Sequence, residues 1–327
     1  MPLLLTEANV KAILTMPMAL ELVETSFRRL AEGAAACHPR RRLRMATKGI
    51  MNYMAASDSA GGYMGLKIYT ISPNGVRFVV PLFNARSGEL CALIEADYLG
   101  QMRTGAASGV ATRVMARADA RAVGIIGTGL QARTQLEAVA LARRLEIIRA
   151  FGRDAARRER FARDMTARLG SPVVAVSSAE EAVRNSDIVI TATTANQPVV
   201  EGDWLEPGMH INAIGSNSAE KQELDALAVG RCDVMAADSV EQSKIEAGDF
   251  IQAFGTDASR WASVREVGDI VANKAPGRTN QSQITLFKSN GIAIEDVVVG
   301  GRVYEIAREK GMGYEIPMWQ EAASAQA

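Results

Sequence analysis

The sequence predicts an α/β protein of two domains, one built on a parallel sheet and one with a mixed α+β fold. Two observations carry this prediction. From residue 122 onward, short apolar runs alternate with helical stretches, which is typical of a parallel sheet covered on both faces. Between residues 50 and 96, β-rich runs follow one another with only turn residues between them, which is typical of a meander. The chain of 327 residues is long enough for both domains.

The first long element is expected to be a helix that ends near Gly33. Thr15 can cap its start, and Pro17 suits its first turn. Its apolar face is expected to contain Leu20, Val23, Phe27 and Leu30, which follow helical spacing.

The β-rich region predicts four strands and then a helix from about Met102 to Ala116. Turn residues separate the strands at 61–62, 73–75 and 87–88. Residues 1–118 are therefore expected to form the first domain, completed by about 306–327. The four β-rich runs are "IMNYMA", "YMGLKIYT", "VRFVVPLFNA" and "ELCALIEA".

The second domain is expected to span residues 119–305. A late strand, "QITLFKS", precedes a helix that starts near Gly291. The earlier strands of the domain are expected in "AVGII", "IIRAF", "VVAV", "DIVITAT", "HINAIG" and "DVMAAD".

The composition excludes several classes of protein. Lysine plus arginine and aspartate plus glutamate each number 37, and this balance argues against binding to nucleic acid or to an anionic membrane. The start, "MPLLLTEANV", lacks the features of a secretion signal, and no apolar window is long enough to span a membrane. Three widely spaced cysteines fit a reducing cytoplasm and form no metal pattern. With only His38 and His210, a His-based metal site or catalytic triad is not expected, and His210 is expected to be packed in an apolar strand.

A glycine-rich turn follows the first strand of the second domain. The segment reads G-x-G-x-x-A and consists of Gly127, Thr128, Gly129, Leu130, Gln131 and Ala132. The first glycine allows a tight turn, the second lets backbone amides approach a pyrophosphate, and the small third residue lets helix and strand pack closely. These residues therefore predict dinucleotide binding in a Rossmann-type domain.

The end of the second strand predicts which nicotinamide cofactor is bound. An acidic residue there would bind a free ribose 2'-hydroxyl, whereas guanidinium groups suit a 2'-phosphate. Gly152 and Arg153 occupy this end, with Arg157 and Arg158 behind them. NADP(H) is therefore favoured over NAD(H). Asp154 takes the acidic role if the strand ends two residues later, and at least one of the helix arginines is expected to be a solvated surface residue.

Several separated motifs resemble the ornithine cyclodeaminase/μ-crystallin family. They include "GLKIYT" around Lys67, "MRTGAAS" at 102–108 and the glycine turn. They continue through "LEPGMHINAIGSNSAEKQELD" and "ITLFKSNGIAIEDV". The resemblance implies NAD(P)-dependent chemistry on α-amino or α-imino acids, a homodimer, and an active site between two domains.

The same motifs suggest a substrate site. Arg103 is expected to open a helix, where a guanidinium and free backbone amides would both meet a carboxylate. Lys67 lies in an apolar strand, and the resemblance favours a proton-handling role over a lysine that reaches for solvent. The resemblance also implies a second carboxylate-binding arginine, and counting back from "NYMA" selects Arg41. A shift of register leaves Arg40, Arg42 and Arg44 as alternatives.

Further cofactor contacts are expected at the carboxyl edge of the parallel sheet, where ligands bind in such folds. Each of these positions could instead be an ordinary end of a strand. The residues assigned to cofactor binding are Thr104, Thr191, Ala192, Thr193, Thr194, Gly215, Ser216, Lys288, Ser289 and Gly291.

One residue departs from the pattern of the cyclodeaminating members. They carry an aspartate six residues before a Glu-Leu pair, and here Glu223-Leu224 places Asn217 at that position. An amide cannot accept a proton as a carboxylate does. Asn217 is therefore a candidate for hydrogen bonding to the substrate or the nicotinamide amide, and cyclodeamination would need another base, such as Asp225 or Glu220.

Together these features predict an NAD(P)H-dependent imine reductase or amino-acid dehydrogenase that delivers hydride to a C=N carbon. Positioning of the two reactants would supply much of the rate. Two alternatives stay open: redox-neutral deamination of the ornithine cyclodeaminase type, and a non-enzymatic NADPH-binding protein.

Overall fold

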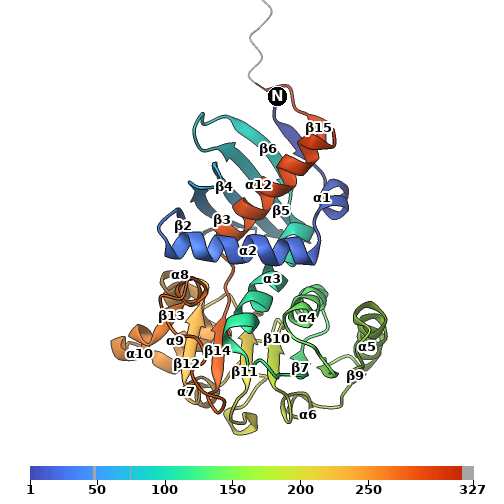
Figure 1. Ribbon diagram of the computed structural model, residues 1–327, viewed down its shortest axis with the longest axis vertical. Helices are drawn as coiled ribbons and strands as arrows, with labels where there is room; N and C mark the ends of the chain where they lie inside the picture. The colour runs from blue at the N-terminus through green and yellow to red at the C-terminus, as the bar shows by residue number, and fades with distance from the viewer. Residues whose placement is uncertain (47–48, 74, 319–327) are drawn as a thin grey trace, which may run out of the picture. The chain divides into compact units, whose positions relative to one another are not determined.

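The computed structural model describes residues 1–46, 49–73 and 75–318 (Figure 1). Its contacts divide the chain into two compact units. The first unit consists of Met1–Thr15, Ala34–Gly100 and the residues from Ala293 onward. The second unit consists of Met16–Gly33 and Gln101–Ile292.

The first unit is built on a seven-stranded sheet in the order β15-β1-β6-β5-β4-β3-β2. Neighbouring strands are antiparallel except β1 and β6, which are parallel. The strands are β1 (Leu3–Leu5), β2 (Ala35–Arg44), β3 (Ile50–Asp58), β4 (Tyr63–Ser72), β5 (Gly75–Asn84), β6 (Leu90–Glu95) and β15 (Tyr314–Glu315).

One face of this sheet is covered by the helix α12 (Ala293–Glu309), which crosses β3, β4 and β5 (Figure 1). The short helix α1 (Glu7–Ile13) packs against α12. Small residues allow the close approach of helix and sheet, because a Cβ at Gly301 would lie 2.7 Å from the ring of Tyr63 and one at Gly300 would lie 3.2 Å from Ile94. The sequence of α12 is therefore adapted to this sheet surface.

The second unit is built on an eight-stranded parallel sheet in the order β13-β12-β14-β11-β10-β7-β8-β9. The central strands are buried and consist mainly of β-branched and other apolar residues, as expected for a sheet covered on both faces. The strands are β7 (Ala122–Ile126), β8 (Ile147–Phe151), β9 (Val173–Ala175), β10 (Ile188–Thr191), β11 (His210–Ala213), β12 (Val234–Ala237), β13 (Val264–Glu266) and β14 (Thr285–Lys288).

Helices pack around this sheet on both sides (Figure 1). The longest is α3 (Asp97–Met115), whose first residues belong to the first unit. The others are α2 (Met16–Ala31), α4 (Leu130–Ala142), α5 (Ala155–Leu169), α6 (Ala179–Val183), α7 (Ala226–Gly230), α8 (Val240–Glu246), α9 (Gly248–Phe254), α10 (Ala258–Ala262) and α11 (Val267–Val271).

The α/β class and the parallel sheet confirm the prediction from the sequence. The features that were not predicted include the strands β1, β2, β13 and β15, and the position of β14 between β11 and β12. The helix α2 packs on α4 and α11, so it groups with the second unit and not with the sheet that follows it in the chain. The turn predicted at 73–75 includes residue 74, and the predicted return segment 306–327 includes 319–327; these residues lie outside the described part of the chain.

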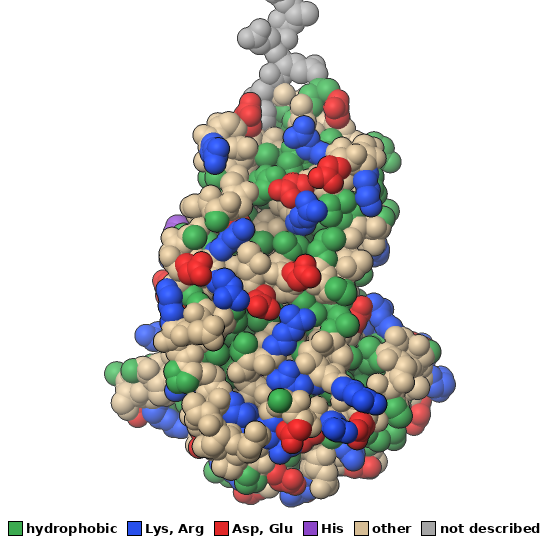
Figure 2. Space-filling model, in the orientation of Figure 1, with side chains coloured by type: hydrophobic (Ala, Val, Ile, Leu, Met, Phe, Trp, Pro, Cys, Tyr) green, Lys and Arg blue, Asp and Glu red, His purple; other side chains and the backbone are tan. Residues whose placement is uncertain are grey.

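Neither the helices nor the surface charge of the described residues has an unusual feature. In the part of the chain that the structure describes, no helix is long and apolar enough to cross a membrane. Acidic and basic side chains are interspersed over the face shown in Figure 2, in line with the zero net charge.

Candidate active site

The glycine turn lies between β7 and α4, at the carboxyl edge of the parallel sheet. Gly127 has φ +112°, and a Cβ there would lie 2.3 Å from the carbonyl oxygen of Ala192, so only glycine fits. Gly129 caps α4, and a Cβ at this position would meet no protein atom within 4 Å. Ala132 is fully buried where helix and strand meet. The space beside Gly129 at the start of α4 is therefore open, which fits a pyrophosphate on a helix N-terminus.

The end of β8 carries basic side chains beside the glycine turn. Asp154 caps α5 by accepting a hydrogen bond of 2.9 Å from the amide of Arg157, so its carboxylate is engaged in the helix start. Arg158 donates to the carbonyl of Gly152 at 2.8 Å and packs over the ring of Phe151. These contacts leave Arg157 as an exposed guanidinium in this segment, and Arg153 is exposed as well.

A buried carboxylate, Glu223, joins the two strand ends that were assigned to the cofactor. One oxygen accepts from the amide and the hydroxyl of Thr193 at 2.8 and 2.7 Å. The other accepts from the hydroxyl of Thr191 and the amide of Gly215, both at 2.7 Å. A Cβ at Gly215 would lie 2.4 Å from this carboxylate, which explains the glycine. Burial raises the pKa of Glu223, and the nearby Lys288 opposes this shift.

Lys288 itself is completely buried and is held by the protein. Its ammonium lies 2.8 Å from Asp249 Oδ2 and donates to the carbonyl of Ser216 at 2.7 Å. The other oxygen of Asp249 accepts from the amides of Glu223 and Leu224 at 2.6 and 2.9 Å. Lys288 therefore connects the segment after β11, through the carbonyl of Ser216, to Asp249, which holds the amides of residues 223 and 224.

Arg103 does not open a helix, and this part of the sequence-based expectation is wrong. The helix α3 begins at Asp97, so Arg103 lies in its second turn, where the backbone amide is inside the helix. Its side chain is nonetheless buried, with 5% exposed, and lies against Gly291: a Cβ there would be 2.5 Å from the guanidinium. The helix start was misplaced because only one residue separates the strand β6 from the helix α3. Asp97 is a favourable residue for the first turn, but no turn residues mark the boundary before it.

Asp238 fixes the segment that borders Arg103. One carboxylate oxygen accepts from the hydroxyl of Ser289 and from the amides of Asn290 and Gly291, at 2.9, 2.8 and 2.6 Å. Burial raises the pKa of Asp238, whereas these hydrogen bonds and the charge of Arg103 oppose that shift. Ser289 and Gly291, both assigned to the cofactor from the sequence, are thus held by a buried acid.

Lys67 lies in the middle of β4 with only 2% of its side chain exposed. Its ammonium lies 2.8 Å from Oδ1 of Asp296, in the first turn of α12, and 5.3 Å from the centre of the Phe78 ring. Gly100 borders the ammonium, since a Cβ there would lie 3.2 Å from Nζ. A buried charge with this setting is a candidate for chemistry.

The register of the sheet shows which arginine shares a face with Lys67. Met54 is the partner of Lys67 across β3, and Asn52 lies two residues away on the same face. Arg42 is the partner of Asn52, so it also lies on this face. Arg41, one residue earlier, faces the opposite side of the sheet and is exposed.

An irregularity of β2 explains the shift from the expected register. The pairing with β3 jumps between His38 and Arg41, which is a β-bulge. Arg40, in the bulge, has 6% of its side chain exposed. Counting along the sequence cannot detect a bulge, so the carboxylate-binding role assigned to Arg41 fits Arg40 or Arg42 better.

The segment after β11 holds Asn217 and the candidate replacement bases. Asn217 and Glu220 are exposed. Asp225 caps α7 and accepts from the amides of Ala228 and Gly202 at 2.6 and 3.0 Å. Glu223 accepts hydrogen bonds from four donors. The carboxylates of Glu223 and Asp225 are therefore both engaged by the protein.

A family model, described as the ornithine cyclodeaminase/μ-crystallin family, matches residues 1–311. The chain belongs to this family. The resemblance noted in the motifs is thereby confirmed, and the fold class is confirmed by the structures below.

The chain is similar to reductases and dehydrogenases of imino and amino acids. It is 35% identical over 261 residues to a Δ1-pyrroline-2-carboxylate reductase of Bacillus cereus, which covers 77% of this chain and 80% of the relative. The structure of the Thermococcus litoralis Δ1-pyrroline-2-carboxylate reductase with NADH and L-proline matches with a TM-score of 0.91 and 36% identity, over 96% and 100% of the chains. An archaeal alanine dehydrogenase dimer with bound NAD matches with a TM-score of 0.91 and 32% identity, over 97% and 99%.

In this family member, several buried acids near the candidate site were missed by sequence reasoning. They are Asp238, Asp249 and Asp296; Glu223 was noted only as a marker for Asn217. Each acid lies beside a strand end or a helix start, where a sequence pattern suggests a cap or a solvated residue. The "ED" pair at the start of the last long helix is the one available signal, because Glu295 and Asp296 stand directly before the apolar residues 297–299.

Proposed function

We propose that this protein is an NAD(P)H-dependent reductase of α-imino acids. The observation that carries the choice over cyclodeamination is the state of the carboxylates after β11. Asn217 is an amide, Glu220 is exposed to solvent, Glu223 is saturated by four donors, and Asp225 is engaged as a helix cap. A carboxylate occupied in this way is a poor general base, because its lone pairs are already taken. The relatives named above, a Δ1-pyrroline-2-carboxylate reductase and an alanine dehydrogenase, support the same reaction type.

The side chains suit a substrate with a carboxylate beside a C=N bond. The reduced nicotinamide, when bound, supplies the hydride. The candidates for binding the carboxylate through charge-assisted hydrogen bonds are Arg103 and either Arg40 or Arg42. Lys67 donates a hydrogen bond to the imine nitrogen and gives a proton to a neutral imine, so that hydride transfer to the carbon yields an amine with the C–N bond intact.

An absorbance assay of cofactor oxidation tests this proposal. The panel contains Δ1-pyrroline-2-carboxylate, its six-membered homologue, and pyruvate with ammonia or methylamine, each with NADPH and with NADH. Turnover with a member of the panel is expected. Release of ammonia from ornithine without net cofactor oxidation would instead establish a cyclodeaminase. Tight NADPH binding without any turnover would establish a binding protein.

We further propose that the cofactor is NADPH in preference to NADH. Arg153 and Arg157 are exposed in the segment that follows β8, and Asp154 is occupied as a helix cap. Guanidinium groups bind a phosphate dianion well. The two structures named above contain NADH and NAD, so the preference rests on the residues of this chain.

The preference is tested by comparing kcat/KM for the two cofactors. Arg157→Ala is expected to lower kcat/KM for NADPH by about 10-fold, since a charge-assisted hydrogen bond contributes about 1.5–3 kcal/mol, and to leave NADH within about two-fold of wild type. Arg160→Ala, an exposed arginine of the same helix, is the matched control. A wild-type enzyme that prefers NADH would overturn the proposal.

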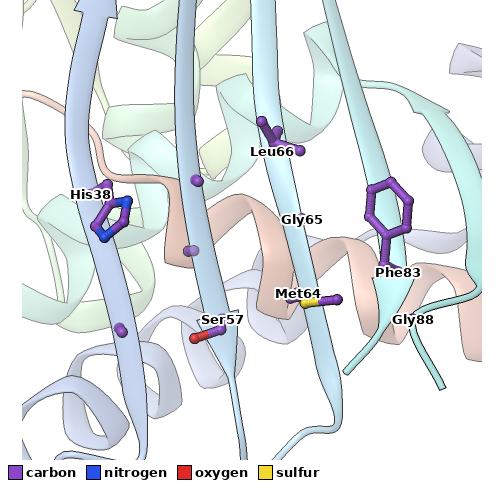
Figure 3. Close-up of a pocket in the computed structure, with 10 residues that line it drawn as sticks. His38, Ser57, Met64, Gly65, Leu66, Phe83 and Gly88 are labelled. Carbon is purple, nitrogen blue, oxygen red and sulfur yellow. The ribbon is translucent and has the colours of Figure 1, made fainter. Parts of the chain in front are cut away.

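We also propose a homodimer formed through the open face of the sheet in the first unit. A cavity of about 470 Å³ lies on this face, opposite α12, and its lining is largely apolar (Figure 3). Met64, Leu66 and Phe83 project into it from neighbouring strands. A second copy of the chain would cover these side chains, and the alanine dehydrogenase named above is a dimer.

The assembly is tested by the molar mass in solution. The wild-type chain is expected at twice the chain mass, and Leu66→Glu is expected to give the monomer, because a carboxylate would be buried in the interface. Leu141→Glu changes an exposed leucine of α4 and serves as the control. A monomeric wild type would contradict the proposal.

A cytoplasmic location is proposed on the cysteines, which form no disulfide among the described residues.

A further inference from the structure

The first turn of α12 places a carboxylate directly against Lys67. Oδ1 of Asp296 lies 2.8 Å from Nζ, and both side chains are buried, with 0% and 2% exposed. We propose that Asp296 is the positioning residue of Lys67, which holds the ammonium in the direction that the reaction needs. This role rests on the proposed imine reduction.

The packing of α12 explains why the two groups meet. Asp296 and Gly300 are four residues apart, so they share one face of the helix. The neighbouring Val297 packs against Gly65 of β4, where a Cβ would lie 2.6 Å from the backbone of Pro81 and 3.4 Å from the valine side chain. Glycines on both elements thus bring helix and strand close enough for the short side chain of Asp296 to reach Lys67.

The contacts of the ammonium restrict its orientation. A lysine has a flexible four-carbon stem and three N–H donors. One donor is directed to Asp296, the ring of Phe78 lies 5.3 Å away, and Gly100 leaves room beside Nζ. A donor held by Asp296 restricts the rotation of the ammonium, which lowers the cost of orienting Lys67 toward a substrate atom.

A purely stabilising role explains the pair poorly. A buried ion pair gains little over apolar side chains of the same size, because the attraction is offset by the loss of hydration. Most other residues of the buried face of α12 are apolar or glycine, including Val297, Gly300, Gly301 and Val303. A carboxylate in this setting is better explained by its effect on Lys67.

A double-mutant cycle tests the role. Turnover of Δ1-pyrroline-2-carboxylate with NADPH and the Kd of NADPH are measured for wild type, Asp296→Asn, Lys67→Met and the double variant. Asp296→Asn is expected to lower kcat by at least about 10-fold while the cofactor Kd stays within two-fold. In the Lys67→Met background the same substitution is expected to change kcat by less than two-fold, because there is no ammonium left to position.

Two further variants keep the result interpretable. Asp296→Glu retains the carboxylate and is expected to recover part of kcat, and it serves if the asparagine variant does not fold. Glu305→Gln removes another carboxylate of α12, one that accepts from Tyr63 of β4 at 3.3 Å, and is expected to leave kcat unchanged.

The outcomes separate this role from the proposed reaction. Losses that multiply in the double variant, or a wild-type kcat in Asp296→Asn, would overturn the role of Asp296 while leaving the reductase in place. Absence of wild-type turnover with the whole substrate panel would overturn the reductase and the role together.

Discussion

Two buried lysine–aspartate pairs of the same length lie in different parts of this protein. Lys67 and Asp296 lie 2.8 Å apart in the first unit, and Lys288 and Asp249 lie 2.8 Å apart in the second. The second pair is tied to the backbone: Lys288 donates to the carbonyl of Ser216, and Asp249 accepts from two amides at residues 223 and 224. The first pair joins a strand to the first turn of a helix, beside an aromatic ring.

The difference predicts two different uses for the same kind of ion pair. Burying two charges contributes little net stability by itself. A pair that also satisfies backbone groups stabilises the segments that it joins, since an unpaired buried amide or carbonyl is costly. The Lys288 pair is of this kind, and the Lys67 pair is the candidate for chemistry. Replacing each whole pair by apolar residues separates the two uses.

The largest effect is expected from Lys67→Met combined with Asp296→Leu. Neither charge of the pair is left buried without its partner, so the melting temperature should change little. The kcat for imine reduction should fall by about 10²–10⁴-fold, the usual contribution of a proton donor in the active site. Calorimetry and the absorbance assay on the same preparation measure both quantities. An active double variant would show that Lys67 takes no part in the reaction.

Lys288→Met combined with Asp249→Leu should have the opposite outcome. The substitutions leave the carbonyl of Ser216 and the amides of Glu223 and Leu224 without their partners. At about 1–3 kcal/mol for each buried group, the free energy of unfolding should fall by about 3 kcal/mol or more. Chemical denaturation measures the loss. Stability equal to that of the Lys67 double variant would remove the distinction between the pairs.

A smaller and more specific effect is expected from Glu223→Gln. Its amide nitrogen must replace one oxygen and therefore face a donor, either the amide of Thr193 or that of Gly215. One buried backbone donor then lacks an acceptor, and the segments after β10 and β11 should loosen at a cost of about 1–3 kcal/mol. The Kd of NADPH should rise about 10-fold with a kcat near wild type at saturation. Glu201→Gln, at an exposed glutamate of the same unit, is the control.

The sequence predicted the framework of the fold better than the details of the site. Apolar runs and glycine turns determine strands such as β7 and β14, because burial forces their composition. The exact helix start at Asp97 and the bulge in β2 depend on tertiary packing, and these two features moved Arg103 and Arg41 from their expected settings. Local patterns record which residues are buried far better than which distant residue each one meets.

The buried acids illustrate the same limit. Asp296 meets Lys67 across 229 positions of sequence, and no local pattern connects them. Lys288 was assigned to the cofactor from its place at a strand end, and the structure shows it engaged by Asp249 and Ser216. A lysine in an apolar strand signals a buried charge, but only the fold identifies the partner.

The smallest effect concerns pH and stability, which the buried groups of the second unit should control. Burial lowers the pKa of His210 to about 3, so its contribution to stability is lost as pH falls from about 6.5 toward 3. Burial raises the pKa of Glu266 to about 7, so its contribution is lost as pH rises from about 4.5 toward 7. Between about pH 4.5 and 6.5 the two dependences oppose each other, each at up to about 1.4 kcal/mol per pH unit.

Single substitutions should therefore expose one slope at a time. His210→Asn keeps a polar group near Thr285, whose hydroxyl lies 2.9 Å from Nδ1. Only Glu266 of the two groups then titrates, so the variant should lose more stability than wild type as pH rises from 4.5 to 6.5. In Glu266→Gln only His210 titrates, so this variant should gain more stability than wild type as pH rises from 4.5 to 6.5. Melting temperatures at intervals across this range measure both. Parallel curves for the two variants would show that neither buried group titrates as its surroundings require.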